Sequence, residues 1–337
     1  MVPGLIVFIG TIIAARFLAR YLYSAGIIAE DRNKKTVRKI AGSGGLAVAF
    51  GIILGILAYT SGGTFVFVPV LSLSSLLAVA LSIMLIAMVG FIDDINVQRE
   101  KVQSTDMMDI RQGLKQWQKP LFTLIGALPL VAISAGVSVI NLPFVGQVNF
   151  GLVYPLVILP LAVIFASNAV NLLGGFDGLQ PGMVLIASLG LLLYSVLFGT
   201  YMGAFLSTLL FASVLAFLPF NAKNSITIPG DSFTYAVGAT MVAIMVMGNE
   251  EAFGLIIFIP WVIEFFLHAR RKFKVTDLGI RQKDGTLKAP YGKRIYSLTH
   301  LIMNMKKATE SDVTVYLCAM EAVFVVLAFG LKMAGLL

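Results

Sequence analysis

Long apolar runs separated by short polar stretches dominate the whole chain. A membrane-spanning helix needs roughly 20 mostly apolar residues, and ten segments approach that length. They lie near residues 3–23, 42–60, 73–92, 120–138, 152–170, 182–199, 202–220, 233–248, 250–268 and 313–335. The pattern predicts an all-α polytopic membrane protein with ten transmembrane helices and a single integral-membrane domain over residues 1–337.

Basic residues are sorted between alternate loops of this pattern. The predicted loops near 24–41, 93–119, 221–232 and 269–312 hold 22 of the 25 Lys and Arg residues, whereas the loops on the other side hold none. Because cytosolic loops of membrane proteins are enriched in Lys and Arg, we place these four loops in the cytosol together with the loop near 171–181. Both termini are then extracytosolic.

Composition supports a membrane protein. Hydrophobic residues make up 58% of the chain and charged residues 12%, and the mean hydropathy is +0.92. A soluble domain carries about a quarter charged residues. The net charge of +8 could indicate nucleic-acid binding, but positive-inside sorting explains it, so we expect no nucleic-acid partner.

Four polar clusters fall on the predicted cytosolic side, and the first is the pair Asp93-Asp94 after Gly90-Phe91-Ile92. Adjacent carboxylates repel and resist ionising together, so a cation or a basic substrate group would offset them. The plainer interpretation is a helix end with solvated acids.

The second cluster runs from Asn168 through Asn171 to Asp177-Gly178. The two asparagines are three residues apart and share one helix face. Amides are costly in lipid, and their oxygens suit Mg²⁺. The alternative is a polar helix cap with interhelical hydrogen bonds.

The third and fourth clusters each have two interpretations. Asp231, in Pro229-Gly230-Asp231-Ser232, is either a helix N-cap or a metal-binding carboxylate. The run Arg270-Arg271-Lys272 after His268 is either a positive-inside signal or a clamp for phosphate oxygens.

Together the clusters offer oxygen ligands for a hard cation and basic side chains for anions, the usual equipment of phosphoryl transfer. The membrane setting indicates a lipid substrate, and no P-loop is present. A secondary transporter is the competing class, although its site would more often lie near the midplane. A CDP-alcohol phosphotransferase is disfavoured because its spaced aspartate motif is absent.

The same clusters carry a family resemblance along nearly the whole chain. The matching motifs are Phe91-Ile92-Asp93-Asp94, the stretch Gly113–Lys119, and Asn168-Ala169-Val170-Asn171 through Asp177-Gly178-Leu179. They resemble the polyprenyl-phosphate N-acetylhexosamine-1-phosphate transferases of glycosyltransferase family 4. This family includes the bacterial phospho-MurNAc-pentapeptide translocases and the eukaryotic dolichyl-phosphate GlcNAc-1-phosphotransferase.

Three further stretches resemble the eukaryotic enzyme: Asp31-Arg32-Asn33-Lys34 with Arg38 and Ile40, Gly230–Tyr235, and Lys283–Lys288. The bacterial triple-histidine motif is absent, so we favour the UDP-GlcNAc branch, with an archaeal member as one interpretation. The chain departs from the family at Arg270-Arg271-Lys272, where the eukaryotic motif is Arg-His-Arg. It also carries Glu264, an intramembrane acid without an assigned partner.

The resemblance implies one catalytic domain that transfers GlcNAc-1-phosphate from UDP-GlcNAc to a polyprenyl (dolichyl) phosphate and releases UMP, at the start of lipid-linked oligosaccharide synthesis for N-glycosylation. It implies Mg²⁺, with Mn²⁺ as an alternative, held by Asn171 and Asp231. Asp93 or Asp94 would orient or deprotonate the lipid phosphate, and we expect Asp94→Asn to cause near-total loss of transfer with intact folding. The other implied contacts are Lys119 and Arg270 to phosphate, Arg271 and Lys272 to the sugar, Asp177 and Gly178 to uridine, and Asn33, Lys34 and Asn168 to substrate.

Two points stay open in the resemblance. Another UDP-N-acetylhexosamine, used for a cell-wall or envelope glycan, is an alternative donor. Many members of the family are dimeric, so a homodimer is a possible assembly. The expected location is an integral membrane protein, in the cell membrane of an archaeon or bacterium, with lateral entry of the lipid and an active site on the cytosolic face.

Overall fold

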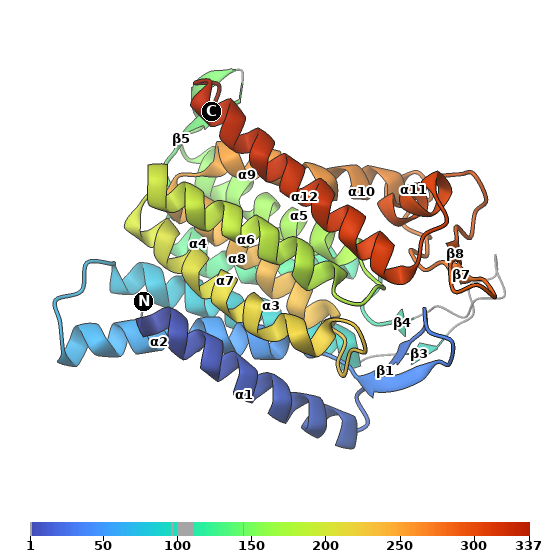
Figure 1. Ribbon diagram of the computed structural model, residues 1–337. Coiled ribbons are helices and arrows are strands. Elements are labelled where there is room, and N and C mark those ends of the chain that lie inside the picture. Colours follow the sequence, from blue (N-terminus) through green and yellow to red (C-terminus); the bar gives the residue numbers. More distant parts are fainter. Residues whose placement is uncertain (1, 96–97, 100–110, 144) are drawn as a thin grey trace.

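The computed structural model describes residues 2–95, 98–99, 111–143 and 145–337. It is a bundle of helices with short strands at its ends (Figure 1). The helices of the described residues are α1 (Val2–Ser24), α2 (Leu46–Phe65), α3 (Leu73–Ile95), α4 (Gln118–Ala132), α5 (Leu159–Leu172), α6 (Leu179–Phe198), α7 (Tyr201–Asn221), α8 (Gly230–Gly248), α9 (Glu251–Ile257), α10 (Ile259–Ala269), α11 (Leu298–Met305) and α12 (Glu310–Met333), with a π-helical turn, Tyr154–Ile158, before α5.

The strands pair as antiparallel hairpins in the loops. They are β1 (Ile28–Asp31) with β2 (Arg38–Ala41), β3 (Gln98–Arg99) with β4 (Arg111–Gln112), β5 (Val139–Leu142) with β6 (Gly146–Asn149), and β7 (Ile280–Arg281) with β8 (Leu287–Lys288). Figure 1 shows β1, β3, β4, β7 and β8 at the end of the bundle away from both termini. Part of the predicted loop 93–119 lies outside the described residues.

The polytopic all-helical class is confirmed, but the count of ten spans is not. Among the described residues, eight helices are long and apolar enough to cross a membrane, and nine if the bent pair α9–α10 forms one span. The predicted span 120–138 corresponds to α4, which has only 15 residues. Ser134 and Gly136 beyond its end adopt left-handed backbone conformations that stop the helix.

The predicted span 250–268 is also not one straight helix. Its two parts, α9 and α10, meet at 54°. Pro260 lies in the first turn of α10, where its missing N–H costs little. A continuous helix would lose a hydrogen bond there, so the break lies where the proline is best tolerated.

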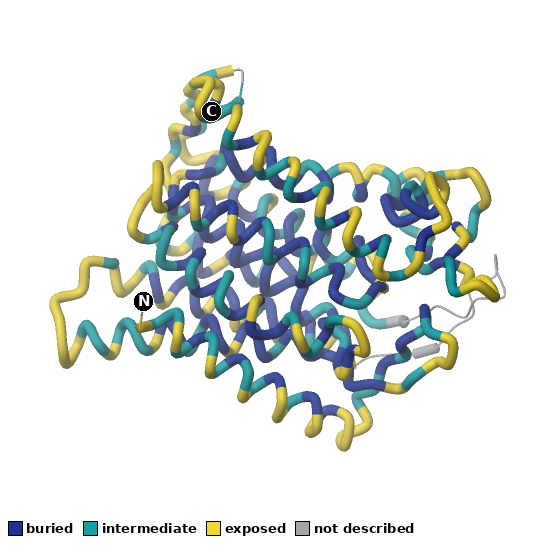
Figure 2. The backbone as a smooth tube through the Cα atoms, in the orientation of Figure 1, coloured by how far each residue is buried: buried dark blue, intermediate teal, exposed yellow. Residues whose placement is uncertain are grey.

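Helix α8 forms the centre of the bundle, packed against α3, α5 and α7. Figure 2 shows the surrounding core as the most buried part of the tube, and 89% of the apolar window of α8 is buried. Gly90 of α3 lies so close to the backbone of Asp231 that a Cβ would not fit. The missing side chain therefore lets the end of α3 meet the start of α8, as small residues do between membrane helices.

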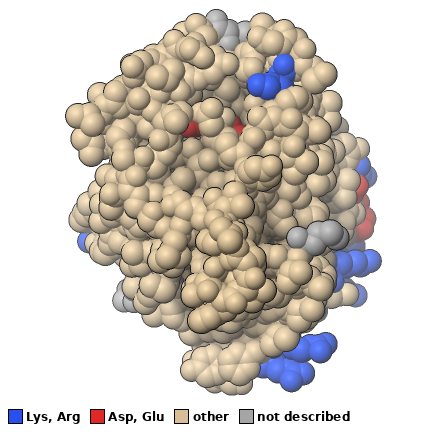
Figure 3. Space-filling view, turned by 90° about the vertical axis from the view of Figure 1, so that its left-hand side faces the viewer, with Lys and Arg blue, Asp and Glu red and all other residues tan. Residues whose placement is uncertain are grey.

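Charge is sorted between the two ends of the bundle. Figure 3 views the end that carries both termini, where charged atoms are few and lie mostly at the margin. The hairpin β1–β2 and the segment 270–307, which carry many of the basic residues, lie on the opposite end (Figure 1). This end therefore holds the predicted cytosolic chemistry.

Candidate active site

A cavity of about 350 Å³ opens at the end of the bundle that carries β1. Segments far apart in sequence form its wall: β1, the end of α5, the loop 174–177, the start of α8, and residues 275–278. Asn171, Asp177 and Asp231 all line it. The structure therefore brings three of the predicted site residues to one space.

Lys119 joins two of the predicted aspartates beside this cavity. Its Nζ lies 2.8 Å from Oδ2 of Asp93 and 3.0 Å from Oδ2 of Asp231. The Asp93 carboxylate also accepts hydrogen bonds from Tyr235 Oη at 3.0 Å and from the backbone N–H of Leu114 at 2.6 Å. Asp93 is only 3% exposed, so the ammonium and these donors offset the desolvation of its negative charge.

Asp94 has different surroundings from its neighbour. Its carboxylate accepts the backbone N–H groups of Asp231 at 2.9 Å and Ser232 at 3.2 Å, and the hydroxyl of Ser43. Gly230, with φ +75°, makes the turn that aims these N–H groups at Asp94. A carboxylate at a helix N-terminus is favoured by the unpaired N–H groups and the helix dipole. Asp94 therefore fixes the turn that presents Asp231.

The two predicted asparagines also differ. Nδ2 of Asn168 donates to Thr123 Oγ1 of α4 at 3.1 Å and to the Ile164 carbonyl at 2.8 Å. The bond to Thr123 is the interhelical hydrogen bond that the plainer interpretation predicted. Asn168 is not on the described cavity wall. Asn171, one turn later, is on that wall.

Asn171 and Asp231 are the residues suited to a divalent cation. Both line the same cavity and offer an amide oxygen and a carboxylate, which are hard ligands of the kind that Mg²⁺ takes. The donor set therefore fits the magnesium ion that the sequence predicts.

The loop that carries Asp177 is fixed by the hairpin β1–β2. Lys34 Nζ lies 2.6 Å from Oδ2 of Asp177 and also contacts Glu310 of α12. Glu310 Oε1 accepts the backbone N–H of Asp177 at 3.1 Å, and Asn33 Nδ2 donates to the Gly175 carbonyl at 2.7 Å. Burial opposes the positive charge of Lys34, but its hydrogen bonds outweigh burial and raise its pKa above the usual 10.5.

Gly178 completes this loop. It has φ +73° at the N-cap of α6, a conformation that favours glycine. Its N–H donates to Oδ1 of Asn221 at 3.2 Å. Gly178 therefore shapes the loop through its backbone and lines a second cavity of about 580 Å³ between α6, α7 and α12.

The predicted basic clamp does not reach the described wall of the first cavity. The Arg271 guanidinium lies 4.6 Å from the ring centre of Tyr291. Arg270 donates to the Ile295 carbonyl at 3.3 Å. Lys272 is exposed and has φ +52°. Cation–π contacts of this kind are favourable, so they hold Arg271 on the loop rather than on the cavity.

Sequence reasoning gave no role to Ser43, Tyr235, Asn221 or Glu310. Tyr235 could have been found, because it follows Asp231 by four residues and shares its helix face. Ser43 contacts Asp94 across 51 residues of sequence, and Glu310 contacts Asp177 across 133. No local pattern marks such contacts.

Comparison with known proteins identifies the family of the chain. Residues 76–249 match the model of glycosyl transferase family 4. A Saccharolobus solfataricus protein named as a UDP-N-acetylglucosamine–dolichyl-phosphate N-acetylglucosaminephosphotransferase is 32% identical, covering 98% of this chain and 96% of its own. A Sulfolobus acidocaldarius protein of the same name is 28% identical, covering 95% and 92%.

A bacterial relative is also similar. The phospho-N-acetylmuramoyl-pentapeptide-transferase of Streptococcus mutans is 30% identical, covering 78% of this chain and 77% of its own. The matched family region includes Asp93, Lys119 and Asp231, which the fold brings into contact. The chain belongs to glycosyl transferase family 4.

Proposed function

We propose that this protein transfers GlcNAc-1-phosphate from UDP-GlcNAc to a polyprenyl phosphate such as dolichyl phosphate, releasing UMP, as the first step of lipid-linked oligosaccharide synthesis. The observation that carries the proposal is the contact of Lys119 with both Asp93 and Asp231 next to the cavity lined by Asn171. It occurs in a chain that matches the archaeal relatives of that name over almost its full length.

The transfer is a displacement at the β-phosphorus of the donor. An oxygen of the lipid phosphate forms the new P–O bond, the bond to the bridging oxygen breaks, and UMP leaves with that oxygen. Asp93 and Lys119 hold the position of Asp231, and Lys119 supplies positive charge near the phosphates. Asp94 keeps the first turn of α8 in place through the N–H of Asp231.

In this proposal Asn171 and Asp231 hold Mg²⁺, which neutralises charge on the pyrophosphate when bound. Asp177 and Gly178 shape the loop for uridine, and Lys34 and Asn33 fix that loop from the first hairpin. Arg270 and Arg271 would reach phosphate or sugar only after leaving their contacts with Tyr291, Tyr296 and Ile295, and the exposed Lys272 would have to turn toward the cavity.

The membrane arrangement is part of the same proposal. The ten apolar segments, counting short α4 and the bent pair α9–α10, carry the chain across the bilayer with both termini extracytosolic. Positive-inside sorting then puts the cavity on the cytosolic face. A lipid phosphate can enter laterally there, with its headgroup at the interface and its tail in hydrocarbon.

The test is UMP release by the purified protein with polyprenyl phosphate and Mg²⁺. UDP-GlcNAc is compared with UDP-MurNAc-pentapeptide, because the Streptococcus mutans relative is named for that sugar, and with other UDP-N-acetylhexosamines. We expect UMP and a GlcNAc-pyrophosphate lipid from UDP-GlcNAc. Preference for another donor would reassign the sugar. Uptake of a UDP-sugar into vesicles without UMP release would favour a transporter.

A further inference from the structure

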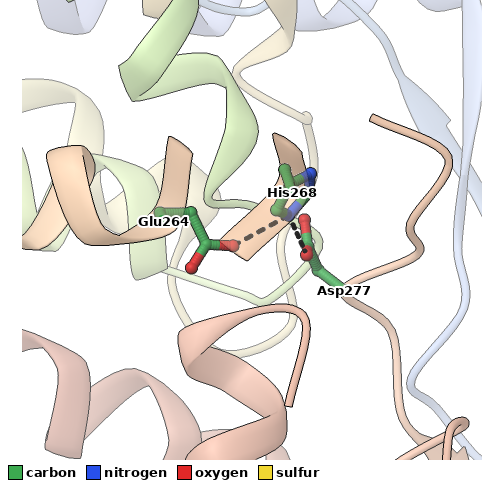
Figure 4. A group of neighbouring side chains, drawn as sticks. All are labelled: Glu264, His268 and Asp277. Atoms are coloured by element: carbon green, nitrogen blue, oxygen red, sulfur yellow. Dashed lines mark hydrogen bonds and ion pairs between the residues drawn. The ribbon is translucent and has the colours of Figure 1, made fainter. Parts of the chain in front are cut away.

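Three side chains converge where α10 leaves the bundle. Glu264 and His268 are four residues apart on one face of α10, and Asp277 reaches them from the following loop (Figure 4). His268 Nε2 lies 2.9 Å from Oε1 of Glu264 and 3.0 Å from Oδ1 of Asp277. The exposed fractions of these side chains are only 0% for Glu264, 5% for His268 and 15% for Asp277. The cluster is therefore a buried group rather than a solvated one.

The cluster has few positively charged groups and few hydrogen-bond donors for its carboxylate oxygens. One nitrogen faces two carboxylate oxygens, and only the Asp277 contact has hydrogen-bond geometry. Oε1 of Glu264 is buried without a hydrogen bond among the described residues. No Lys or Arg in the described part of the chain forms an ion pair with either carboxylate. With both carboxyl groups ionised, even a protonated His268 leaves the group with a net negative charge, which is costly when buried.

A second group of acids shows how this chain balances such charge elsewhere. Asp31, Asp177 and Glu310 also lie close enough to share a metal ion. There, Lys34 contacts Asp177 and Glu310, and Arg38 lies 2.7 Å from Asp31. Side-chain cations therefore already occupy that group. The cluster at α10 has only one imidazole for the same task.

The ligand atoms at α10 are held in place by their surroundings. The other oxygen of Glu264 accepts the backbone N–H of Leu298 at 2.7 Å. The Asp277 carbonyl accepts the hydroxyl of Thr299 at 2.9 Å. Outer contacts of this kind orient metal ligands. The three ligand atoms lie within 4.8 Å of one another, and two residues four apart on a helix are a common metal-binding arrangement.

We propose that Glu264, His268 and Asp277 bind a divalent transition-metal ion, with Zn²⁺ as the best match, separate from the Mg²⁺ of the transfer site. An imidazole nitrogen with two carboxylates suits Zn²⁺ better than Mg²⁺, which favours oxygen ligands alone. The ion makes the group electrically neutral and ties α10 to residues 275–278, which line the cavity. Its role is structural: it fixes one wall of the substrate cavity.

The test measures metal content of the full-length protein in detergent, stripped with chelator and reloaded with Zn²⁺ in a large excess of Mg²⁺. We expect about one Zn²⁺ per chain for the wild type and for Asp284→Asn, an exposed acid of the same loop. His268→Gln and Asp277→Asn should lose it. Asp231→Asn should keep it, which separates this site from the proposed Mg²⁺ site. Equal Zn²⁺ in the wild type and His268→Gln would overturn the proposal.

Two measurements on the wild type test the proposal even if a variant does not fold. Zn²⁺ should raise the Tm of the stripped protein, because a ligand that binds only the folded state stabilises it. X-ray absorption at the zinc edge should show imidazole and oxygen neighbours at about 2.0–2.2 Å and no sulfur. No retained Zn²⁺ and no change in Tm would instead assign the cluster as an ion pair of protonated His268. None of these readouts depends on transfer activity, so they stand apart from the proposed function.

Discussion

Buried and half-buried acids lie at both ends of α8, but their partners differ. At its start, Asp93 and Asp231 share the ammonium of Lys119 beside a cavity. Just past its end, Glu250 accepts the hydroxyl of Ser195, and Glu251 accepts the hydroxyl of Tyr154 at 2.6 Å. Neither glutamate lines either of the two described cavities.

This difference distinguishes acids that stabilise the fold from acids that we assign to the transfer site. A hydroxyl can pair with a carboxyl oxygen in either protonation state, so the contacts of Glu250 and Glu251 involve no cation. The aspartates instead contact the ammonium of Lys119, and that pairing can act on phosphate only where a cavity admits the substrate. Burial of an acid alone therefore does not identify the proposed transfer site, where the acids have both a lysine partner and an adjacent cavity.

The largest expected effect is at Asp231. Asp231→Asn removes the proposed metal carboxylate and one partner of Lys119. We expect UMP release to fall by at least about 100-fold, since such metal contacts contribute several kcal/mol to the barrier. The measurement is kcat with UDP-GlcNAc, on protein whose Tm and elution volume match the wild type. Retained turnover would remove Asp231 from the site.

The effect expected at Asp94 is smaller than that at Asp231, and smaller than the near-total loss that the family resemblance implied. The described partners of the Asp94 carboxylate are backbone N–H groups and a hydroxyl, and they hold the turn of Asp231 in place. Asp94→Asn weakens charge-assisted bonds worth about 1.5–3 kcal/mol each, so transfer should fall by about 10- to 100-fold. Ser43→Ala, which removes one donor to Asp94, should act in the same direction and more weakly. If Asp94→Asn were inactive while Asp231→Asn kept activity, the assigned roles would be reversed.

Variants that loosen the loop of Asp177, which we propose binds uridine, should change the affinity for the donor. Lys34→Met breaks the contacts that fix Asp177 and Glu310. We expect KM for UDP-GlcNAc to rise by about 3- to 10-fold, equivalent to about 1 kcal/mol, with little change in kcat. Lys35→Met is the matched control, since Lys35 is the exposed next residue. Equal effects of the two variants would argue against the assigned role of Lys34.

The smallest effect is expected at the opposite end of α8. Glu250→Gln keeps the shape of a side chain whose described hydrogen bond is to Ser195. We expect kcat and KM to stay within about twofold and the free energy of unfolding to change by about 1 kcal/mol. A loss of turnover comparable with that of Asp231→Asn would show that the comparison of the two ends is wrong.

Much of the fold could be predicted because a helix that spans the bilayer needs roughly 20 mostly apolar residues, and this rule can be applied to the sequence directly. That rule located the eight long apolar helices of the described residues. It missed the early end of α4, which depends on the left-handed backbone of Ser134. It also missed the break before Pro260, because hydropathy takes no account of the N–H that a proline lacks. Hydropathy treats such residues as part of one continuous span.

The candidate site was predicted in part. The family resemblance pointed to Asp93, Lys119, Asn171 and Asp231, which the fold gathers at or beside the cavity. It could not separate Asp93 from Asp94, because neighbouring residues on a helix point in different directions and meet different partners. Glu264, which had no partner in the sequence, contacts His268 and the N–H of Leu298.

The central position of α8 has a consequence for the protein's response to its bilayer. Hydrophobic mismatch acts on helices through their contact with acyl chains. The outer helices α1 and α12 are each only 28% buried in their apolar windows, against 89% for α8. Thicker or thinner lipid should tilt these outer helices first and leave the turn of Asp231 in place. The reaction centre is thereby insulated from membrane thickness, although the lipid substrate itself comes from that membrane.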